Sequence, residues 1–472
     1  MAMLQLLQAL RPAASITWLG PIAILSYLIA RSILRILFLS PRNIPGPFLA
    51  RFSRLWYLRQ ILKGDFEKTN IALHRRHGSI SPWYFASGSP DGKTFDLFTD
   101  PSPARHAANR RKVAALYSNT SLLKMEPAVH ECTKILVENF KRIAESGESV
   151  NVQFWMQCYA FDLIGLITVS RRFGLLDNGE DNTGMLKSLH TYLRYCASVG
   201  VYSEFHPWLF RALLVFGTSG FSHMISFTAQ QISHRKSLSG EDDFLGKVLA
   251  MNKESPGKFT DTDVFLTCIT NIGAGSDTTS ISLTSILYHL VTERRCLDKL
   301  RAEIHEHESA GNLSHPITVK EAQNLPYLQA IIKEALRLHP ATGLPLGRVV
   351  PEGGATIAGQ RFPKGSVVGI NTWVAHRNKD VFGEDAEVFR PERWLEGPER
   401  ARKMNEYFIP FGHGSRTCIG KNISLMEISK LIPELVTQFE FTPAHPTRRL
   451  TTENVWFVKQ LDIEVKVHLR AT

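Results

Sequence analysis

A single cysteine near the end of the chain lies in a segment that can do chemistry. That segment reads Phe411-Gly412-His413-Gly414-Ser415-Arg416-Thr417-Cys418-Ile419-Gly420. Its glycines allow the backbone to turn tightly around the Cys418 sulfur. The apolar run that follows favours a helix, whose N-terminus would direct N–H groups at the sulfur, and Arg416 adds a nearby cation, so both favour the thiolate. Such a thiolate can act as a nucleophile or as an axial ligand of haem iron.

A second segment combines an apolar helical pattern with polar residues at its centre. Val264–Thr292 contains one ionic side chain, Asp277, within Gly273-Ala274-Gly275-Ser276-Asp277-Thr278-Thr279. Glycine costs about 1 kcal/mol in a helix relative to alanine, and a buried carboxylate needs partners. The small residues would leave room for a flat cofactor and O2, with an acid and an alcohol to manage protons. A transmembrane span is the alternative, and the polar centre argues against it.

Two further motifs lie between these segments. Glu334 and Arg337 stand at i and i+3 on one predicted helix face. Alone, such a pair is usually a solvated surface pair that contributes little. A Phe-Arg-Pro-Glu-Arg-Trp segment that contains Arg393 follows it and precedes the cysteine segment. The order of the motifs along the chain therefore carries more information than any one of them.

Taken together, these motifs resemble those of the cytochrome P450 family. The pattern Phe-x-x-Gly-x-Arg-x-Cys-x-Gly matches the haem-binding loop, and the Gly-Ala-Gly-Ser-Asp-Thr stretch matches the oxygen-binding motif. The resemblance extends over about residues 41–465 in consistent order. It implies a mainly α fold with small β-sheets, a triangular prism of helices that encloses haem b. The run Arg110-Arg111-Lys112-Val113, Tyr117-Ser118 and Met125-Glu126-Pro127 resembles fungal members near the pisatin demethylase group.

The resemblance also implies roles for particular residues. Cys418 would be the axial ligand of the haem iron, in a loop that includes Phe411 and Gly420. Thr278 would hydrogen-bond the bound oxygen, and Asp277 would supply protons through water. Ala274 and Gly275 would pass closest to the haem face, and Glu334, Arg337 and Arg393 would form a structural triad. The haem propionates would be bound by Arg416, Arg348 and Arg110 (or Arg111). His106 stands where the family often has Trp.

Composition narrows the class of protein. The chain has 472 residues, of which 44% are hydrophobic and 21% charged, as expected of a folded globular protein. The net charge of +11 comes without a nucleic-acid-binding signature, so anionic lipid or an acidic protein partner is favoured over nucleic acid. Six cysteines are scattered without a CxxC motif, which argues against zinc, thioredoxin-type and c-type haem sites and fits a reducing compartment.

The N-terminal segment predicts a membrane anchor. Residues 13–30 carry no charge and approach the length that spans a bilayer. Arginines at 31, 35 and 42 follow, which predicts a cytosolic body, and a cleaved signal peptide is the alternative. We expect an anchor over residues 1–40, in the endoplasmic reticulum membrane, and a catalytic domain over residues 41–472. A proline-rich stretch, 41–47, would act as a stiff hinge between them.

The body is predicted to be mostly helical. Apolar residues recur at helical spacing over Leu122–Ala144, Asn151–Thr168 and Met185–Val201. Ser79–Pro103 is rich in turn residues and reads as loop, and short β-like pieces occur over Ala341–Val374. In the family a strand pair and a short helix normally follow the segment that ends at Gly78. Here the chain continues almost directly into the later loop, so one supersecondary element is predicted to be missing.

The resemblance predicts a monooxygenase. Electrons would come from NADPH through a P450 reductase that docks on the basic cysteine-loop face. The substrate would be an apolar small molecule, in fungal secondary metabolism, bound among residues 83–105, 192–227, 270–278, 341–346 and 455–457. Two alternatives stay open. One is a P450 that does not monooxygenate, such as an isomerase, a dehydratase or a phenol-coupling enzyme, against which the intact Asp277–Thr278 pair argues. The other is an inactive remnant that results from the missing segment.

Overall fold

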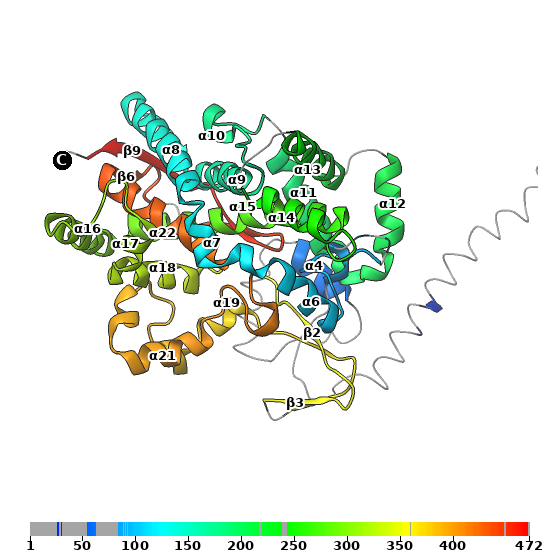
Figure 1. Ribbon diagram of the computed structural model, residues 1–472. Helices are drawn as coiled ribbons and strands as arrows, with labels where there is room; N and C mark the ends of the chain where they lie inside the picture. Colours follow the sequence, from blue (N-terminus) through cyan, green and yellow to red (C-terminus); the bar gives the residue numbers. More distant parts are fainter. Residues whose placement is uncertain are drawn as a thin grey trace, which may run out of the picture.

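The computed structural model describes residues 26, 27, 30, 54–62, 84–87, 89, 91, 93–182, 184–216, 220–237, 243–358, 360–447 and 450–470. The predicted anchor, apart from three residues, and the shortened segment after Gly78 lie outside the described residues. The described part is mainly helical with small β-sheets, as the sequence predicts. In Figure 1 the helices form most of the body, with β2 and β3 at its lower edge and β6 and β9 at its left.

The α-helices are α4 (Leu55–Leu62), α6 (Pro103–Val113), α7 (Asn119–Leu123), α8 (Glu126–Ser146), α9 (Val152–Val169), α10 (Leu175–Asn178), α11 (Met185–Val199), α12 (His206–Phe216), α13 (Gly220–Lys236), α14 (Phe244–Glu254), α15 (Asp261–Thr292), α16 (Arg294–Ser309), α17 (Val319–Gln323), α18 (Pro326–Leu338), α19 (Thr372–Ala375), α20 (Lys379–Phe382), α21 (Pro398–Tyr407) and α22 (Lys421–Gln438). The 3-10 helices are η1 (Tyr84–Ser87), η2 (Ala114–Tyr117), η3 (Gly200–Phe205), η4 (Pro391–Leu395) and η5 (Gly414–Arg416). The strands are β1 (Ser149–Asn151), β2 (Arg348–Val349), β3 (Ala355–Ile357), β4 (Gln360–Phe362), β5 (Val367–Val368), β6 (Phe439–Pro443), β7 (Thr451–Asn454), β8 (Val458–Leu461) and β9 (Glu464–Leu469).

The sheets are small and antiparallel. The largest has the order β1-β9-β6, so the last strand of the chain pairs with both its neighbours. Its register places Val150 opposite Val465 and Phe441 opposite Val467, and all four side chains are buried. The other pairs are β2-β5, β3-β4 and β7-β8. The sheets therefore brace the edges of a helical body, and the helices carry most of the core.

Two long helices, α9 and α15, form the centre of that core (Figure 1). Helix α9 is apolar almost all round, as a fully buried helix should be. Within the described part of the chain it is the one helix long and apolar enough to span a membrane, yet 78% of it is buried inside the protein. Its Gly165 faces Phe173, and an added Cβ there would lie 2.7 Å from the ring. Helix α9 is therefore a core element.

Helix α15 begins with a capping box. The Thr260 side chain accepts a hydrogen bond from the Asp263 N–H, and the Asp263 carboxylate accepts one from the Thr260 N–H. This reciprocal cap satisfies two donors that a helix start would otherwise leave unpaired. Helix α15 then continues through the glycines at 273 and 275 to Thr292. The sequence prediction of a continuous helix is confirmed, with its start three residues earlier than expected.

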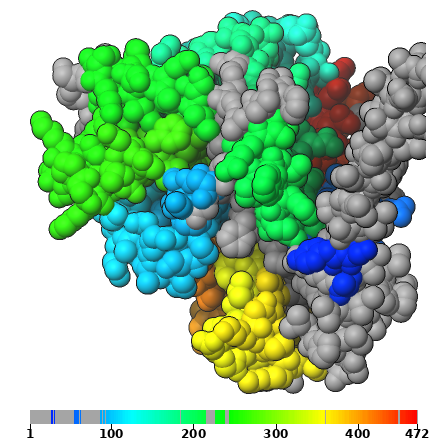
Figure 2. Space-filling view, turned by 90° about the vertical axis from the view of Figure 1, so that its right-hand side faces the viewer, coloured from blue at the N-terminus to red at the C-terminus, as the bar shows by residue number. Residues whose placement is uncertain are grey.

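Figure 2 shows the face on which the η3–α12 segment lies above the β2–β5 region, with the α6–η2 segment beside it. Large apolar side chains are exposed in this segment. Trp208 is 73% exposed, and Phe205 and Leu209 are also exposed. Large apolar side chains of η3 and α12 are therefore exposed among the described residues.

Candidate active site

The loop before α22 presents Cys418 at its end. Gly412 and Gly414 both have φ +72°, a left-handed conformation that glycine adopts without strain. The Cys418 N–H donates to the Phe411 carbonyl oxygen over 2.8 Å, which closes the turn. A Cβ added to Gly420 would lie 3.9 Å from the Cys418 sulfur. The loop therefore holds the thiol at the N-terminal end of α22, and its residue is exposed.

The electrostatics of the thiol differ from the sequence prediction. The sulfur is crowded by protein atoms even though the residue remains accessible, and this desolvation raises the pKa of Cys418 above its ordinary value. The N–H groups of Gly420 and Lys421 and the cation of Arg110 act in the opposite direction. Arg416, the predicted cation, instead points away, toward carbonyl oxygens of another segment. The protein alone does not favour the thiolate, so a bound metal cation would have to stabilise it.

Three predicted cations surround a buried imidazole. The His106 side chain is 3% exposed, and burial lowers its pKa, assisted by the nearby charges of Arg416, Arg110 and Arg348. Arg416 donates to the Asp100 carbonyl oxygen over 2.6 Å, and Arg348 donates to two carbonyl oxygens of its own loop. The structure thus brings together, from α6, β2 and the cysteine loop, the three arginines that the sequence assigned to propionates.

Sequence reasoning missed a tyrosine that connects three segments near the thiol. The Tyr117 hydroxyl donates to the Asn271 side-chain oxygen on α15 over 2.6 Å. The Asn422 side chain, four residues after Cys418, donates to the Tyr117 carbonyl oxygen over 3.0 Å. Burial raises the pKa of Tyr117, with a smaller contribution from Cys418. Nothing in the spacing of these residues indicates that they meet, because they lie 154 and 305 positions apart.

The two faces of α15 differ in their surroundings. Ala274 is exposed, and Thr278, one turn later, donates its hydroxyl to the Ala274 carbonyl oxygen over 2.8 Å. Asp277 and Thr279 are buried, and Thr279 donates to Ser424 of α22 over 3.1 Å. The uncovered face therefore carries a small residue and an alcohol. The Asp277 side chain does not lie on that face.

Gly275 lies where α15 packs against α9. A Cβ at this position would lie 2.8 Å from the Ile164 side chain of α9. The missing side chain of Gly275 thus faces α9, where it permits the close approach of the two central helices. Gly275 therefore serves helix packing on its α9 side, and Ala274 is the small residue on the uncovered face.

Asp277 is held from two sides. It is fully buried, and its Oδ1 accepts a hydrogen bond from the Gln157 amide of α9. The amine of Lys459 on β8 lies 3.0 Å from the other oxygen, Oδ2. That oxygen accepts no well-directed hydrogen bond, so the amine is within ion-pair distance but off the hydrogen-bond axis. The acid and the alcohol are neighbours in sequence, but the acid is turned toward the C-terminal hairpin.

The charged triad is fully buried behind the cysteine loop. Arg337 donates to both oxygens of Glu334, over 2.9 and 2.8 Å, and Arg393 donates to one of them over 2.9 Å. The Trp394 indole and the Arg390 N–H complete the set of donors to the Glu334 carboxylate. All three side chains of the triad are 0% exposed. The structure thus brings together the three residues that the sequence motifs single out.

A histidine joins this triad to the cysteine loop. Arg337 donates to the His376 carbonyl oxygen over 2.7 Å, and the His376 ring nitrogen Nδ1 contacts the Arg337 carbonyl oxygen at 3.0 Å. The other nitrogen, Nε2, accepts from the Ile409 N–H over 2.9 Å, two residues before the loop. Burial lowers the pKa of His376 to about 3, so its ring is neutral and can accept. Sequence reasoning missed this residue.

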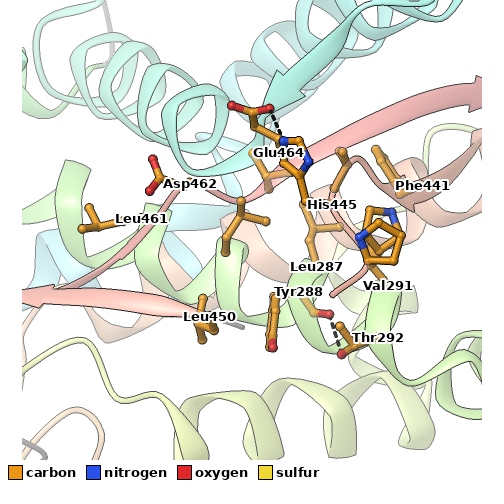
Figure 3. Close-up of a pocket in the computed structure, with 15 residues that line it drawn as sticks. Leu287, Tyr288, Val291, Thr292, Phe441, His445, Leu450, Leu461, Asp462 and Glu464 are labelled. Atoms are coloured by element: carbon orange, nitrogen blue, oxygen red, sulfur yellow. Dashed lines mark hydrogen bonds and ion pairs between the residues drawn. The ribbon is translucent and has the colours of Figure 1, made fainter. Parts of the chain in front are cut away.

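A surface pocket lies far from these residues. It is at the end of α15 and is lined by Val152, Leu287, Tyr288, Val291, Thr292, Phe441, Pro443, His445, Pro446, Leu450, Leu461, Asp462, Ile463, Glu464 and Val465. Figure 3 shows the His445–Glu464 ion pair, 3.4 Å, at its rim. The lining contains neither cysteine-loop residues nor the uncovered face of α15. The described residues also hold no group of three or more His, Cys, Asp or Glu side chains that could bind a metal.

An exposed thiol at a helix start, a ring of cations and a small-residue helix face define a haem-thiolate class of protein, and the comparisons agree. The family model Cytochrome P450 matches residues 71–467. Pisatin demethylase of Fusarium vanettenii is 37% identical, over 96% of this chain and 94% of the relative. Cytochrome P450 monooxygenase cicH of Emericella nidulans is 33% identical, over 91% and 94%. The chain therefore belongs to the cytochrome P450 family.

Solved structures show the same fold. A crystal structure of the cytochrome P450 CYP102L1 has a TM-score of 0.68 at 20% identity, and it covers 79% of this chain and 81% of that one. The P450DA heme domain has a TM-score of 0.67. The family implies an oxidoreductase with a haem cofactor, and it generally uses redox partners and apolar substrates. The residues present fit that group, because Cys418 can ligate the iron and Arg110, Arg348 and Arg416 can face its propionates.

Proposed function

We propose that this chain is a haem-thiolate monooxygenase that transfers one oxygen atom from O2 to an apolar small molecule. The observation that carries the proposal is the combination of an exposed Cys418 at the start of α22 with an uncovered α15 face that carries Ala274 and Thr278. When bound, haem supplies the oxygen chemistry, and a thiolate ligand favours O–O cleavage. The other oxygen atom leaves as water.

The chain's own residues hold and support the site. Cys418 would ligate the iron, and Phe411 and Gly420 would shape the loop around it. Arg110, Arg348 and Arg416, with His106 among them, would bind the propionates. Thr278 would hydrogen-bond the oxygen that binds at the haem, and Asp277 would supply protons. The triad of Glu334, Arg337 and Arg393 would keep the loop in place through His376.

Several aromatic side chains support an apolar or aromatic substrate. Phe98 and Trp456 have ring centroids 5.2 Å apart, and Trp456 stacks on Phe457. Phe457 pairs with Thr342 in an isolated β-bridge, and the Tyr192 hydroxyl donates to the Ser87 carbonyl oxygen. Segments predicted to line the substrate site thus meet although they are distant in sequence. The relatives named pisatin demethylase favour pisatin as a first substrate to test, in fungal secondary metabolism.

The electron source and the location are also part of the proposal. Electrons would come from NADPH through a P450 reductase docked beside the cysteine loop, where Lys421 adds to the basic surface. Residues 1–40 would anchor the enzyme in the endoplasmic reticulum membrane, with a catalytic domain over 41–472 facing the cytosol. The exposed apolar side chains of η3 and α12 support association with a membrane.

The alternative of an inactive remnant rests on one specific observation. The alignment with the pisatin demethylase is 492 positions long and thus exceeds the 472 residues of this chain, so the relative carries residues that this chain lacks. The remnant would fold poorly around haem or not bind it. The proposed monooxygenase would bind haem despite the shorter chain.

A spectroscopic experiment separates these possibilities. The expressed protein, reduced and exposed to carbon monoxide, should show the red-shifted Soret band of thiolate-ligated haem. Cys418→Ser should lose that band, whereas Cys296→Ser, at a buried cysteine on α16, should keep it. A band at the position of a non-thiolate haem in the unmodified chain would favour the remnant. Product analysis with reductase, NADPH and pisatin then distinguishes monooxygenation from isomerisation, dehydration or phenol coupling.

A further inference from the structure

A chain of charged side chains leads from the surface to Asp277. Its exposed fraction falls step by step, from 55% at Arg194 to 31% at both His190 and Glu453, 12% at Lys459 and 0% at Asp277. The members come from four elements, α11, β7, β8 and α15, so the fold and not the sequence assembles them. This series is the Asp277 cluster, defined as Asp277, Lys459, Glu453, His190 and Arg194.

The inner contact of the cluster is a buried ion pair. Lys459 Nζ is 3.0 Å from Asp277 Oδ2, and that oxygen has no well-directed hydrogen bond. Removing one partner of a buried pair leaves an uncompensated charge. The Gln157 amide fixes only the other oxygen, Oδ1. Asp277 therefore depends on Lys459 for its orientation, and one of its oxygens can still exchange partners.

The outer contacts bring a second acid within reach of the same lysine. Glu453 and Lys459 are directly opposite in the β7-β8 register, where side chains on one face are neighbours. Glu453 in turn lies 3.7 Å from His190 and 3.9 Å from Arg194, which are one turn apart on α11. Burial lowers the pKa of His190, Lys459 and Arg194 lower it further, and Glu453 and Asp277 oppose them. The other four groups of the cluster therefore all act on His190.

We propose that Lys459 is the positioning residue of Asp277 and that the His190–Glu453 pair is where protons from solvent reach it. When Lys459 turns from Asp277 to Glu453, the carboxylate of Asp277 becomes free to accept a proton and to release it toward Thr278. Each proton that leaves Asp277 is replaced by one that enters from water at His190 and is passed on through Glu453 and Lys459, which turns back to Asp277, so the cluster returns to its starting charge. Only protons move. This inference rests on the proposed function, because a monooxygenase consumes protons at the face of α15 that carries Thr278.

A titration tests the cluster without any turnover. The pKa of His190 is measured by NMR on histidine-labelled protein, with the signal assigned by its loss in His190→Gln. Lys459→Met should raise that pKa, and Asp277→Asn should lower it, each by about half a unit. Lys466→Met, at an exposed lysine on β9 in the separate β1-β9-β6 sheet, should leave it unchanged. If neither Lys459→Met nor Asp277→Asn moves the pKa of His190, the cluster does not exist as proposed.

A second measurement tests the proton supply. In the haem-loaded enzyme with reductase, Lys459→Met should increase the solvent deuterium isotope effect on NADPH oxidation and divert electrons from product to peroxide. Lys459→Arg should restore most of the coupling. An isotope effect and coupling that stay at the unmodified values in Lys459→Met would overturn the proposal, provided that Asp277→Asn changes both.

Controls keep the outcomes distinguishable. Lys459→Met can unfold the protein by leaving Asp277 unpaired, so the double variant Asp277→Asn/Lys459→Met, which removes both charges, is compared by thermal unfolding and should regain stability. A chain that binds no haem would end the proposed function, and the His190 titration would still report on the cluster. A haem-loaded, active enzyme with an unchanged His190 pKa in all variants would refute the cluster alone.

Discussion

Two clusters of charge, one fully buried and one that extends from a buried acid to the surface, are satisfied to different degrees. The Glu334 carboxylate accepts hydrogen bonds from Arg337, Arg393, the Trp394 indole and the Arg390 N–H, and all three charged side chains are fully buried. The Asp277 carboxylate has one amide donor and one off-axis amine, and its cluster reaches the surface through His190 and Glu453. The first arrangement fixes a loop in place. The second can rearrange.

The difference follows from how each cluster is connected. Arg337 and Arg393 also donate to backbone carbonyls of the segments around them, such as His376 and Asp385. Fully paired buried charges therefore hold several loops at once, which suits a support for Cys418. Lys459 makes one short ion pair and stands opposite a second acid. A pair with an alternative partner suits a step in which a proton must move.

The largest effect is expected where pairing is complete. Glu334→Gln keeps the shape but removes the charge that pairs two buried arginines, so that Arg337 has no carboxylate partner and Arg393 keeps only Asp385. We expect a loss of about 3 to 5 kcal/mol in the free energy of unfolding. Urea unfolding of the full chain, followed by tryptophan fluorescence, measures it. Glu384→Gln removes an exposed partner of Lys379 and should cost less than about 1 kcal/mol. Similar losses of unfolding free energy in the two variants would show that the buried triad contributes no more than an exposed ion pair.

Lowering the pH should reduce the free energy of unfolding through His376, the histidine that contacts the triad. Burial lowers the pKa of His376 to about 3, below the 6.5 of an unfolded histidine. Between these values the unfolded chain binds a proton that the folded chain does not, so the stability present above pH 6.5 is lost as pH falls. At pH 5 the loss from one such histidine is about 2 kcal/mol. Urea midpoints at pH 7, 6 and 5 measure it. His339 and His289, whose pKa values burial also lowers to about 4 and about 3, add to it. A flat profile over this range would contradict the expectation.

A helix-packing substitution tests the contact between α9 and α15, the two helices that hold Gln157 and Asp277 of the second cluster. Gly275→Ala would place a Cβ 2.8 Å from Ile164, closer than real contacts, and should cost about 1 to 3 kcal/mol. Ile164→Ala in the same chain should recover part of that loss, because it opens the space. Thermal unfolding of the two single variants and the double variant measures the coupling. Additive effects would mean that α9 and α15 do not meet at this glycine.

The smallest effect is expected at a buried carboxyl with no partner. Both oxygens of Glu427, within α22, lack a hydrogen bond, and burial raises the pKa of Glu427 well above its ordinary value. The folded chain therefore holds a proton that the unfolded chain releases above pH 4.5, and stability falls as pH rises. Glu427→Gln removes this dependence, so its stability relative to the unmodified chain should rise by about 1 kcal/mol between pH 6 and pH 7. An unchanged difference between the two proteins would show that Glu427 is ionised in the fold.

Much of the fold follows from the sequence, because helical spacing reports on local structure. The predicted helices Leu122–Ala144, Asn151–Thr168 and Met185–Val201 correspond to α8, α9 and α11, each within a few residues at its ends except for the start of α8. The expected β-pieces after residue 341 are β2 to β5. Helix ends were less accurate, since capping residues such as Thr260 and the glycines that end α8 and α10 decide them.

The motifs also indicated which residues gather at the site, but not how they are oriented. The sequence by itself determined the family, the haem cofactor that the family implies and the motifs that contain Cys418, Thr278 and Glu334. Only the tertiary structure decided that Asp277 faces Lys459, that Gly275 faces Ile164 and that His376 connects the triad to the loop. Motifs record chemical requirements along the chain. Orientation, pairing and burial depend on segments that are more than a hundred residues apart and that meet only when the helices pack.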